Sequence, residues 1–462
     1  MTAIAIEEIV TQLHHSFSAQ RSRPLNWRIA QLRNMERMLT EHSSVFSAAL
    51  AEDLGKSETE AWTTEIGFLL NDIKHTLKHI RKWVKPRNVS SPLAMQPATS
   101  RLTPEPLGVV LVFGAWNYPL QLTLSPVIAA IAAGNCVCVK PSEVSPAVSA
   151  AIAQYLPQYL DTDCVQVVEG DAQVAGQLLS QRFSHIFYTG GGQVGKKVMR
   201  AAADHLTPVT LELGGKSPVV VSRHADIAAT ARRIVWGKFL NAGQTCIAPD
   251  YVLVEASVHT QLVTELKAAL TQFYGDDPEQ SDDYGRIVAE RHIDRLAGLL
   301  NDPELQHAQV HGGEVNRASR YFAPTVIDHC PAHAKVMDDE IFGPILPIIE
   351  VENLPEAYAF IQSRAHPLAC YVFTKDKSEQ VHAEHIIQCG SLCFNDTMVF
   401  MLNPALPFGG VGASGMGRYH GQWGFDQLSH LKPVVHRSFM FDIDVRYPPY
   451  TKAKQKMLKK LL

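Results

Sequence analysis

The chain has 462 residues, 46% of them hydrophobic, so it can bury a substantial core over two or three domains. Its formal net charge of −4 is nearly neutral for this length, and no basic stripe or acidic tail indicates nucleic acid as a partner. The N-terminus carries early acids and no apolar core, unlike a secretory signal, so we expect a cytoplasmic protein.

Helix-like and strand-like segments alternate along the first half of the chain. Apolar residues recur at helical spacing over residues 5–52 and 57–84. Short apolar runs predict buried strands over Val109–Phe113, Cys136–Val139, Val165–Val168, His185–Thr189 and Val209–Leu213. Helices are predicted over Pro126–Ala133, Pro146–Tyr159 and Val194–His205. This alternation predicts an α/β protein with mainly parallel sheets, in the rhythm of a dinucleotide-binding domain.

The residues after Leu213 begin a second unit that also alternates strand and helix. A helix predicted over Ile227–Leu240 ends in a loop of small residues that carries Cys246. No Pro/Gly/Ser linker, low-complexity stretch or internal repeat marks a boundary between the two units.

The eight cysteines indicate free thiols rather than a disulfide framework, and their spacing matches no zinc pattern, so no metal site is expected. Cys136 and Cys138 alternate within an apolar run and are expected on a buried strand. Cys389 and Cys393 lie four residues apart without a partnering cysteine or histidine pair, which favours packing over metal binding.

Three segments carry groups that oxidation of an aldehyde through a thioester requires. Asn-Ala-Gly-Gln-Thr-Cys at 241–246 offers the thiol of Cys246, which would add to the carbonyl. Phe-Gly-Ala-Trp-Asn-Tyr-Pro at 113–119 offers the amide of Asn117, a donor for the resulting alkoxide. Leu-Glu-Leu-Gly-Gly-Lys-Ser-Pro at 211–218 offers the carboxylate of Glu212, a base that would activate water. Alone, Cys246 could be a packing residue, and Asn117 could cap a turn.

With these segments the chain resembles the NAD(P)-dependent aldehyde dehydrogenase superfamily, from about residue 40 to the C-terminus. Further motifs occur in the family's order: Val-Lys-Pro-Ser-Glu at 139–143, Tyr-Thr-Gly-Gly-Gly-Gln-Val-Gly at 188–195, Glu-Ile-Phe-Gly-Pro at 340–344 and Leu-Pro-Phe-Gly-Gly-Val-Gly at 406–412. Segments at 82–87, 415–421 and 445–450 resemble the class 3 branch, which oxidises fatty and aromatic aldehydes and usually forms dimers.

The resemblance implies a Rossmann-type cofactor domain, a second α/β catalytic domain and a β oligomerisation arm. The cofactor domain would comprise residues 1–81 and 104–213, and the catalytic domain residues 214–400. Residues 82–103 and 401–462 would form the oligomerisation and C-terminal segments of a homodimer.

The glycines after the strand at 185–189 permit two interpretations. Gly190, Gly192 and Gly195 match Gly-x-Gly-x-x-Gly, which would make Glu212 the ribose-binding acid. The resemblance instead implies a looser phosphate-binding turn that includes Gly190, Gly191 and Gly195, with Glu143 as the ribose partner beside Lys140. We favour the second interpretation, because the first leaves the thioester without a base.

The resemblance also assigns the nicotinamide end of the cofactor and the substrate pocket. Glu340 is expected to bind the nicotinamide ribose, and Phe342 to pack near the nicotinamide. Tyr118, Trp236 and Leu240 would line an apolar path to the thiol, although core packing explains them as well. Asn395 and Phe400 lie in the loop that often shapes the mouth of this path in class 3 members.

A carboxylate at Glu143 should repel a 2′-phosphate, so we expect NAD to be preferred and NADP to be accepted. A CoA-acylating semialdehyde dehydrogenase and a non-catalytic relative remain alternatives, although the presence of Glu212 favours water as the acceptor. The basic segment 452–462 is too short to span a membrane. It would make weak contact with an anionic membrane surface or form a solvated helix end.

Overall fold

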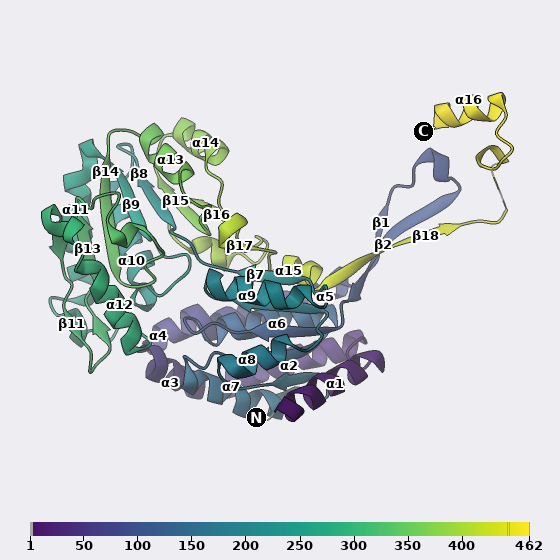
Figure 1. Cartoon of the computed structure of the whole chain (residues 1–462), viewed down its shortest axis with the longest axis horizontal. Coiled ribbons are helices and arrows are strands. Elements are labelled where there is room, and N and C mark those ends of the chain that lie inside the picture. Colours follow the sequence, from purple (N-terminus) through teal and green to yellow (C-terminus); the bar gives the residue numbers. More distant parts are fainter. Residues whose placement is uncertain (1–2, 441, 443, 462) are drawn as a thin grey trace.

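The computed structural model describes residues 3–440, 442 and 444–461. Two α/β units lie side by side, and a thin three-stranded arm extends from them (Figure 1). The first unit is built on a six-stranded sheet and the second on a seven-stranded sheet. The predicted mixed α/β class with parallel sheets is confirmed.

The six-stranded sheet has the order β17-β7-β6-β3-β4-β5 and is parallel except for β17. Its strands are β3 (Val109–Phe113), β4 (Cys136–Lys140), β5 (Val165–Val167), β6 (His185–Thr189), β7 (Val209–Glu212) and β17 (Gly415–Met416). β3, β4 and β6 are buried along their whole length, which explains their nearly continuous apolar sequence. Cys136 and Cys138 lie on β4 as predicted, and all eight cysteines are free.

Helices cover both faces of this sheet; α1 and α6, for example, both contact β3 and β4. The helices of this unit are α1 (Ala3–Ser18), α2 (Leu25–Glu41), α3 (Ser43–Leu54), α4 (Glu58–Ala61), the π-helix η1 (Trp62–Ile66), α5 (Gly67–Trp83), α6 (Gln121–Ala133), α7 (Pro146–Tyr159), α8 (Ala172–Leu179) and α9 (Gly192–Ala203). The predicted bounds of β3, β6 and α7 are confirmed.

The predicted start of α6 at Pro126 is wrong, because the helix begins five residues earlier and carries the proline inside. The backbone N–H groups of Leu120 and Gln121 donate to the buried Glu65 carboxylate, at 2.8 and 3.1 Å. A helix start needs acceptors for its first N–H groups, and here they come from a residue about 55 positions earlier. Local sequence could not indicate this.

The seven-stranded sheet has the order β10-β13-β14-β9-β8-β15-β16, and only β10 is antiparallel to its neighbour. Its strands are β8 (Pro218–Val221), β9 (Tyr251–Glu255), β10 (Gln309–His311), β13 (Thr325–Asp328), β14 (Ile345–Val351), β15 (Ala369–Phe373) and β16 (Ser391–Phe394). Its helices are α10 (Ile227–Phe239), η3 (Leu240–Gly243), α11 (Ala256–Tyr274), α12 (Glu290–Leu300), α13 (Leu354–Gln362) and α14 (Lys377–Ile386). The segment between β10 and β13 forms a small hairpin of β11 (Val315–Asn316) and β12 (Tyr321–Phe322).

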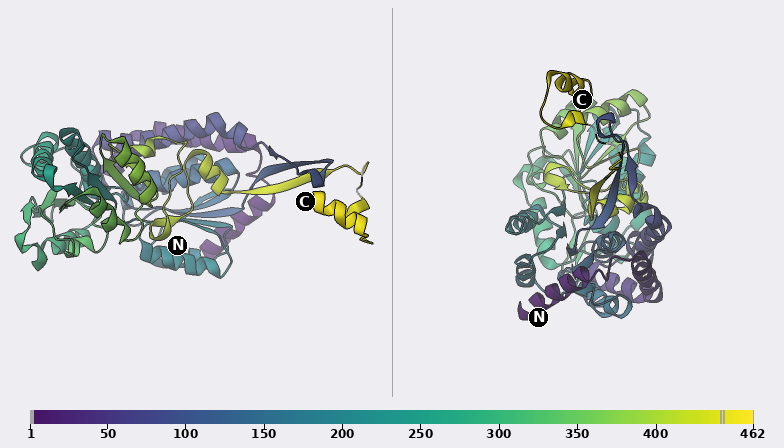
Figure 2. Two further views of the ribbon diagram at one scale, coloured as in Figure 1. Left: turned by 90° about the horizontal axis from the view of Figure 1, so that it is seen from above. Right: turned by 90° about the vertical axis from the view of Figure 1, so that its right-hand side faces the viewer.

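The arm consists of β1 (Arg87–Val89), β2 (Ala98–Pro106) and β18 (Ser429–Arg437), with β2 in the centre. It projects away from the body in Figure 1 and in the left view of Figure 2, and α16 (Lys452–Leu461) lies at its far end. α15 (Gly421–Gln427) packs against α5 and α6 at its base. Short helical turns complete the structure: η2 (Leu93–Met95), η4 (Pro278–Gln280), η5 (Pro303–His307), η6 (Lys335–Met337), η7 (Val399–Leu402), η8 (Gly412–Ser414) and η9 (Asp444–Arg446).

The predicted division into domains at 81, 103, 213 and 400 stays a prediction. β17 joins the six-stranded sheet beside β7, so the chain beyond residue 400 also contributes to the first unit. Within the described residues, no helix is both long and apolar enough to cross a membrane.

Candidate active site

The residues predicted for the site gather where the two sheets face each other. Asn117 follows β3, Lys140 ends β4, Gly190 follows β6 and Glu212 ends β7, so all four lie at the carboxyl edge of the six-stranded sheet. This edge is where open parallel sheets bind their ligands. Cys246 lies in the loop that precedes β9, at the amino edge of the other sheet, and it interacts electrostatically with Glu212.

The loop before the thiol has an unusual backbone. Asn241, Ala242 and Gly243 have φ angles of 53°, 49° and 75°, in the left-handed region that non-glycine residues rarely adopt. Two side chains hold the loop: the Asn241 amide donates to the Asn117 carbonyl at 2.7 Å, and the Gln244 amide donates to the Arg286 carbonyl at 2.9 Å. Strained backbone held in this way is common at functional sites. The run Asn-Ala-Gly-Gln is therefore a support for the thiol.

The segment after β3 that carries Asn117 is hydrogen-bonded to the same loop. Asn117 is buried, and its side-chain amide donates to the Gln244 carbonyl at 3.1 Å. The Tyr118 hydroxyl lies 2.7 Å from Thr245 Oγ1, one residue before the thiol. The structure thus brings Asn117 and Tyr118 to the thiol loop, as the sequence predicts.

Lys56 and Glu65 form a fully buried ion pair of 2.5 Å beneath this segment, which sequence reasoning missed. Lys56 also donates to the Asn117 carbonyl at 3.2 Å, and its ammonium lies 3.9 Å from the Tyr118 ring centre. Glu65 lies in the π-helix η1, a distortion often found at functional sites. The only signal in the sequence was a charged residue in an apolar helical segment.

The thiol and the carboxylate share an environment that disfavours charge. Burial raises the pKa of Cys246, and the nearby carboxylates of Glu340 and Glu212 raise it further. The backbone N–H groups of Cys246 and Ile247 act in the opposite direction, because they donate to the sulfur and lower its pKa. These N–H groups would also stabilise an oxyanion formed beside the sulfur.

Glu212 is buried, and burial raises its pKa well above the ordinary value. Neither carboxylate oxygen has a hydrogen-bond partner among the described residues. Tyr419, which the sequence did not single out, lies close enough to Glu212 and Cys246 to interact with both electrostatically. A buried carboxyl group without a partner is costly for stability, and such groups are typical of functional sites.

The predicted cofactor residues of the first sheet form a turn and an ion pair. Lys140 is buried and donates to the half-exposed Glu143 carboxylate at 2.8 Å. Gly190 has a φ of +156°, while Gly191 has open space where a side chain would project. Gly195 packs against Leu213, so a side chain there would separate α9 from the end of β7. An open glycine turn at the start of α9 fits a pyrophosphate.

The predicted nicotinamide end lies across from this turn. Glu340 borders a cavity of about 280 Å³ with Gly214, Gly215 and Lys216, and its Oε1 has no hydrogen-bond partner among the described residues. Burial and the neighbouring Asp250 raise the pKa of Glu340 to about 8. Phe342 packs edge-on against Trp116, with ring centres 5.1 Å apart. A free carboxylate oxygen and an aromatic ring fit a ribose and a nicotinamide.

The residues predicted for the substrate pocket occupy different environments. Tyr118 is buried and Leu240 half-buried, but Trp236 is 40% exposed. Trp236 faces a surface hollow of about 680 Å³ whose lining includes Asp396 and Val399. It therefore lies beside Val399, in the loop expected to shape the mouth, and its place in the substrate path stays a prediction.

That loop is connected to the thiol through aromatic residues. Phe400 stacks on Tyr371 with ring centres 6.4 Å apart, and the Tyr371 hydroxyl donates to the Ile247 carbonyl at 2.5 Å. Asn395, also expected near the mouth, accepts a hydrogen bond from the Thr374 backbone N–H at 2.8 Å. The contacts therefore run from Phe400 to the residue that follows Cys246.

The sequence model of the aldehyde dehydrogenase family matches residues 1–434. The chain belongs to this family. Aldehyde dehydrogenase family 3 member H1 of Arabidopsis thaliana is 45% identical over 455 residues, which cover 98% of this chain and 94% of that protein. A rat (Rattus norvegicus) protein named "Aldehyde dehydrogenase, dimeric NADP-preferring" is 44% identical over 449 residues, covering 96% and 98%.

A solved structure of Staphylococcus aureus AldH, described as its substrate-bound state, matches with a TM-score of 0.96 at 42% identity. The match covers 98% of this chain and 99% of that one. The predicted resemblance to the class 3 branch and the predicted fold are confirmed. The protein is an NAD(P)-dependent aldehyde dehydrogenase.

Lys238 is a further residue of this aldehyde dehydrogenase that sequence reasoning missed. It lies near the end of α10, eight positions before Cys246 in the sequence, and is fully buried. Its Nζ has no hydrogen-bond partner among the described residues, and burial lowers its pKa to about 8. The negative charges of Asp250 and Glu340 raise the pKa of Lys238 and so oppose this shift. Lys238 therefore lies near Glu340, the carboxylate expected to bind the nicotinamide ribose.

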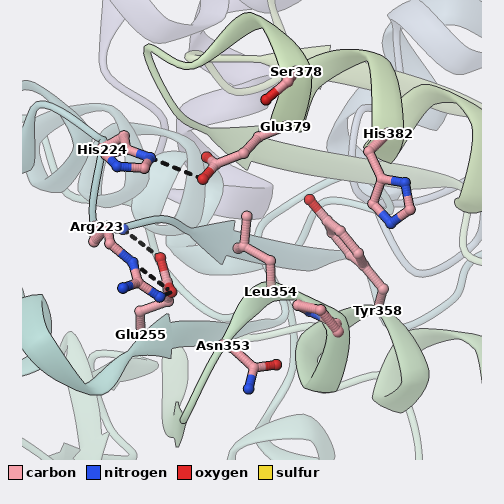
Figure 3. Close-up of a pocket in the computed structure, with 10 residues that line it drawn as sticks. Arg223, His224, Glu255, Asn353, Leu354, Tyr358, Ser378, Glu379 and His382 are labelled. Carbon is pink, nitrogen blue, oxygen red and sulfur yellow. Dashed lines mark hydrogen bonds and ion pairs between the residues drawn. The ribbon is translucent and has the colours of Figure 1, made fainter.

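A separate hollow of about 570 Å³ lies at the carboxyl ends of β8 and β9, the opposite edge of that sheet from the thiol loop (Figure 3). Its charged side chains are paired. Arg223 binds Glu255, and His224 Nδ1 lies 2.8 Å from a Glu379 carboxylate oxygen, as the dashed lines in Figure 3 mark. These charged groups are therefore already neutralised within the protein.

Proposed function

We propose that the enzyme oxidises long-chain aliphatic or aromatic aldehydes to carboxylic acids through a thioester on Cys246. The observation that carries this proposal is the pairing of Cys246 with an unpartnered, buried Glu212 at facing edges of the two sheets. A base with free oxygens beside a thiol is what hydrolysis of a thioester needs.

The steps assign one role to each residue. The Cys246 thiol gives its proton to solvent, and its sulfur adds as thiolate to the aldehyde carbon. The Asn117 amide and the Cys246 backbone N–H donate hydrogen bonds to the resulting alkoxide. Bound NAD(P) supplies the acceptor for the hydride that leaves this carbon. Glu212 then takes a proton from water as the oxygen attacks the thioester, which releases the carboxylic acid and the thiol.

The cofactor fits the residues present. Lys140 and Glu143 would hold the adenosine ribose, Gly190, Gly191 and Gly195 would leave room for the pyrophosphate, and Glu340 and Phe342 would hold the nicotinamide riboside. The free Glu340 Oε1 and the open Gly191 support this assignment.

Variants of Cys246 and Glu212 test the mechanism. Cys246→Ala should abolish oxidation, whereas Glu212→Gln should keep an initial burst of reduced cofactor followed by turnover slowed about 10²-fold or more, because acylation precedes the step that needs the base. Stopped-flow absorbance measures both phases. Cys389→Ala, which removes another half-buried thiol, is the matched control and should behave like the wild type. Normal steady-state turnover of Glu212→Gln would contradict its role.

NAD is proposed as the preferred cofactor, with NADP accepted. The Glu143 carboxylate disfavours a 2′-phosphate, but Lys140 already neutralises part of its charge, which supports tolerance. Glu143→Gln should therefore raise the ratio of kcat/KM with NADP to that with NAD by about tenfold, mainly through KM for NADP. Glu169→Gln, at a glutamate that follows the neighbouring strand β5, should leave the ratio unchanged. A ratio that favours NADP in the wild type would overturn the preference.

A substrate panel tests the aldehyde class. Efficiency should rise with chain length from short to long straight-chain aldehydes, or show an optimum for benzaldehyde-type and cinnamaldehyde-type compounds. The aromatic contacts from Phe400 to Ile247 support apolar substrates. Inactivity across the panel with reduced Cys246 would favour a CoA-dependent semialdehyde enzyme.

The proposal extends to a cytoplasmic homodimer. All eight cysteines are free, as expected in a reducing compartment. The arm exposes apolar side chains that a second copy would cover, among them Leu93, Phe439 and Met440.

Weak contact with an anionic membrane surface is proposed for α16. This helix is exposed along most of its length and carries five lysines with Met457 and Leu458 between them. Co-sedimentation with vesicles containing phosphatidylserine should be lost when residues 452–462 are deleted, and its absence in the intact protein would end this part of the proposal.

A further inference from the structure

A cluster of two histidines and a carboxylate lies outside the candidate active site. His259 comes from the first turn of α11, Asp328 is the last residue of β13, and His329 follows it. One ligand atom from each residue lies within 4.8 Å of those from the other two. Imidazole nitrogens and a carboxylate oxygen are ligands that zinc prefers.

Two atoms of this cluster are buried without hydrogen bonds. His259 Nε2 and Asp328 Oδ1 lie 2.9 Å apart, yet neither makes a directed hydrogen bond to any residue that the structure describes. Their residues are only 3% and 6% exposed. Buried polar atoms normally have partners, because leaving them unpaired costs stability. A metal ion between them would satisfy both.

The other ring nitrogen of His259 is also placed as in a metal site. His259 Nδ1 lies 3.5 Å from the Glu350 carboxylate on β14. A histidine that binds metal commonly directs its second nitrogen to a carboxylate, which leaves the first nitrogen free to act as the ligand. Glu350 would therefore orient the His259 ring toward Asp328.

His329 reaches the cluster through an uncommon backbone conformation. Its φ is +52°, in the left-handed region, and its ring centre lies 4.4 Å from that of His259. A strained residue persists where its surroundings or its function require it. Here this backbone conformation brings a second imidazole beside the His259 ring.

We propose that His259, Asp328 and His329 form a site for a divalent transition metal ion, zinc above all, with water completing the coordination. The ion would connect α11 to the end of β13. Asp328 ends its strand, whereas the thiol loop enters the parallel strand β9 at the other edge of the sheet. The ion would therefore stabilise the fold and take no part in aldehyde oxidation.

A second group of similar composition makes a matched comparison. His224, Asp376 and Glu379 also lie within 4.8 Å of one another. Their carboxylates are already used: Asp376 caps α14 through the backbone N–H groups of Ser378 and Glu379, and Glu379 accepts from Thr374 and contacts His224. This group has no buried free atom to offer, so we expect it to bind zinc poorly.

Zinc titration of the full-length, chelator-stripped protein tests the site. The titration should use a Cys246→Ala background, which removes the candidate active-site thiol as a competing ligand. We expect one tight zinc per chain and a rise in Tm on zinc addition. His329→Asn should weaken zinc binding at least about tenfold and abolish the rise; asparagine tolerates the left-handed backbone, and the position is exposed, so folding should be preserved. Glu350→Gln should weaken binding about 10-fold to 100-fold.

Two histidine variants are the controls. His224→Ala and His333→Ala remove other histidines that contact carboxylates, and neither should change the affinity for zinc. The proposal is overturned if the chain binds no zinc, if His329→Asn binds it as tightly as the background protein, or if His224→Ala is the variant that loses it.

Discussion

The site of this enzyme holds two carboxyl groups whose burial raises their pKa values. Glu340 and Glu212 have oxygens without hydrogen-bond partners among the described residues, and both lie near Cys246. Above its ordinary pKa, such an acid ionises in the unfolded chain, where water solvates the charge, but it stays protonated in the folded protein. Ionisation therefore stabilises the unfolded state relative to the folded state. The enzyme is therefore less stable at a pH at which these groups would be ionised when unfolded.

Replacing Glu340 by glutamine should make stability less dependent on pH. The pKa of this acid is raised from its ordinary value of 4.5 to about 8, so its favourable contribution is complete below pH 4.5 and is lost as the pH rises to 8. Each pH unit within this window costs at most about 1.4 kcal/mol. Urea unfolding of Glu340→Gln should show a gain over the wild type that grows from pH 5 to pH 8. Glu314→Gln, at an exposed site, should show no such trend. A constant difference across this range would refute the shift.

At the residue scale, the sequence indicated the groups now proposed to react but not the groups that hold them in place. Cys246, Asn117 and Glu212 belong to motifs whose chemistry can be recognised from the amino-acid sequence alone. Lys56 and Lys238 act through burial and through contacts with residues far along the chain, which no local pattern records. Trp236 fitted an apolar helical spacing, but its exposure depends on how α10 packs.

At the scale of elements, the buried Lys56–Glu65 pair connects three segments. Glu65 lies in η1 and accepts from the N–H groups that begin α6, while Lys56 follows α3 and reaches the Asn117 carbonyl. The strands were predictable because buried parallel strands are continuous apolar runs. The start of α6 could not be predicted, because the acceptor for its first backbone N–H groups is the Glu65 carboxylate of η1.

Breaking the Lys56–Glu65 pair should destabilise the enzyme and displace Asn117, whose backbone carbonyl accepts a hydrogen bond from Lys56. Lys56→Met leaves the Glu65 carboxylate buried without its partner, and we expect a loss of about 3–5 kcal/mol in the free energy of unfolding. Glu65→Gln keeps an oxygen for the N–H groups of α6 and should cost less. Urea unfolding measures both variants. Arg317→Met, which breaks an exposed pair with Asp294, should cost less than about 1 kcal/mol. An equally small loss for Lys56→Met would show that the buried pair does not hold the segment.

At the scale of the whole molecule, no described element covers the arm. β1 and β18 form the two edges of its sheet, so each leaves one row of backbone groups without a neighbouring strand among the described residues. The left view of Figure 2, which shows the arm from the side, has no other part of the body lying along it. Exposed strand edges with apolar side chains are surfaces that proteins normally pair or cover.

Polar substitution at the end of β18 should therefore weaken self-association. Phe439 and Met440 follow this strand and are among the most exposed apolar side chains of the chain, so covering them in a dimer would remove a large apolar area from water. The double variant Phe439→Ser/Met440→Ser should shift the dimer–monomer equilibrium toward monomer by about tenfold or more, as measured by light scattering over a dilution series. Val381→Ser, an exposed apolar residue on α14, should leave the equilibrium unchanged. If the wild type is a monomer at every concentration, or if both variants dissociate alike, the arm is not the interface, and its apolar side chains must meet another surface.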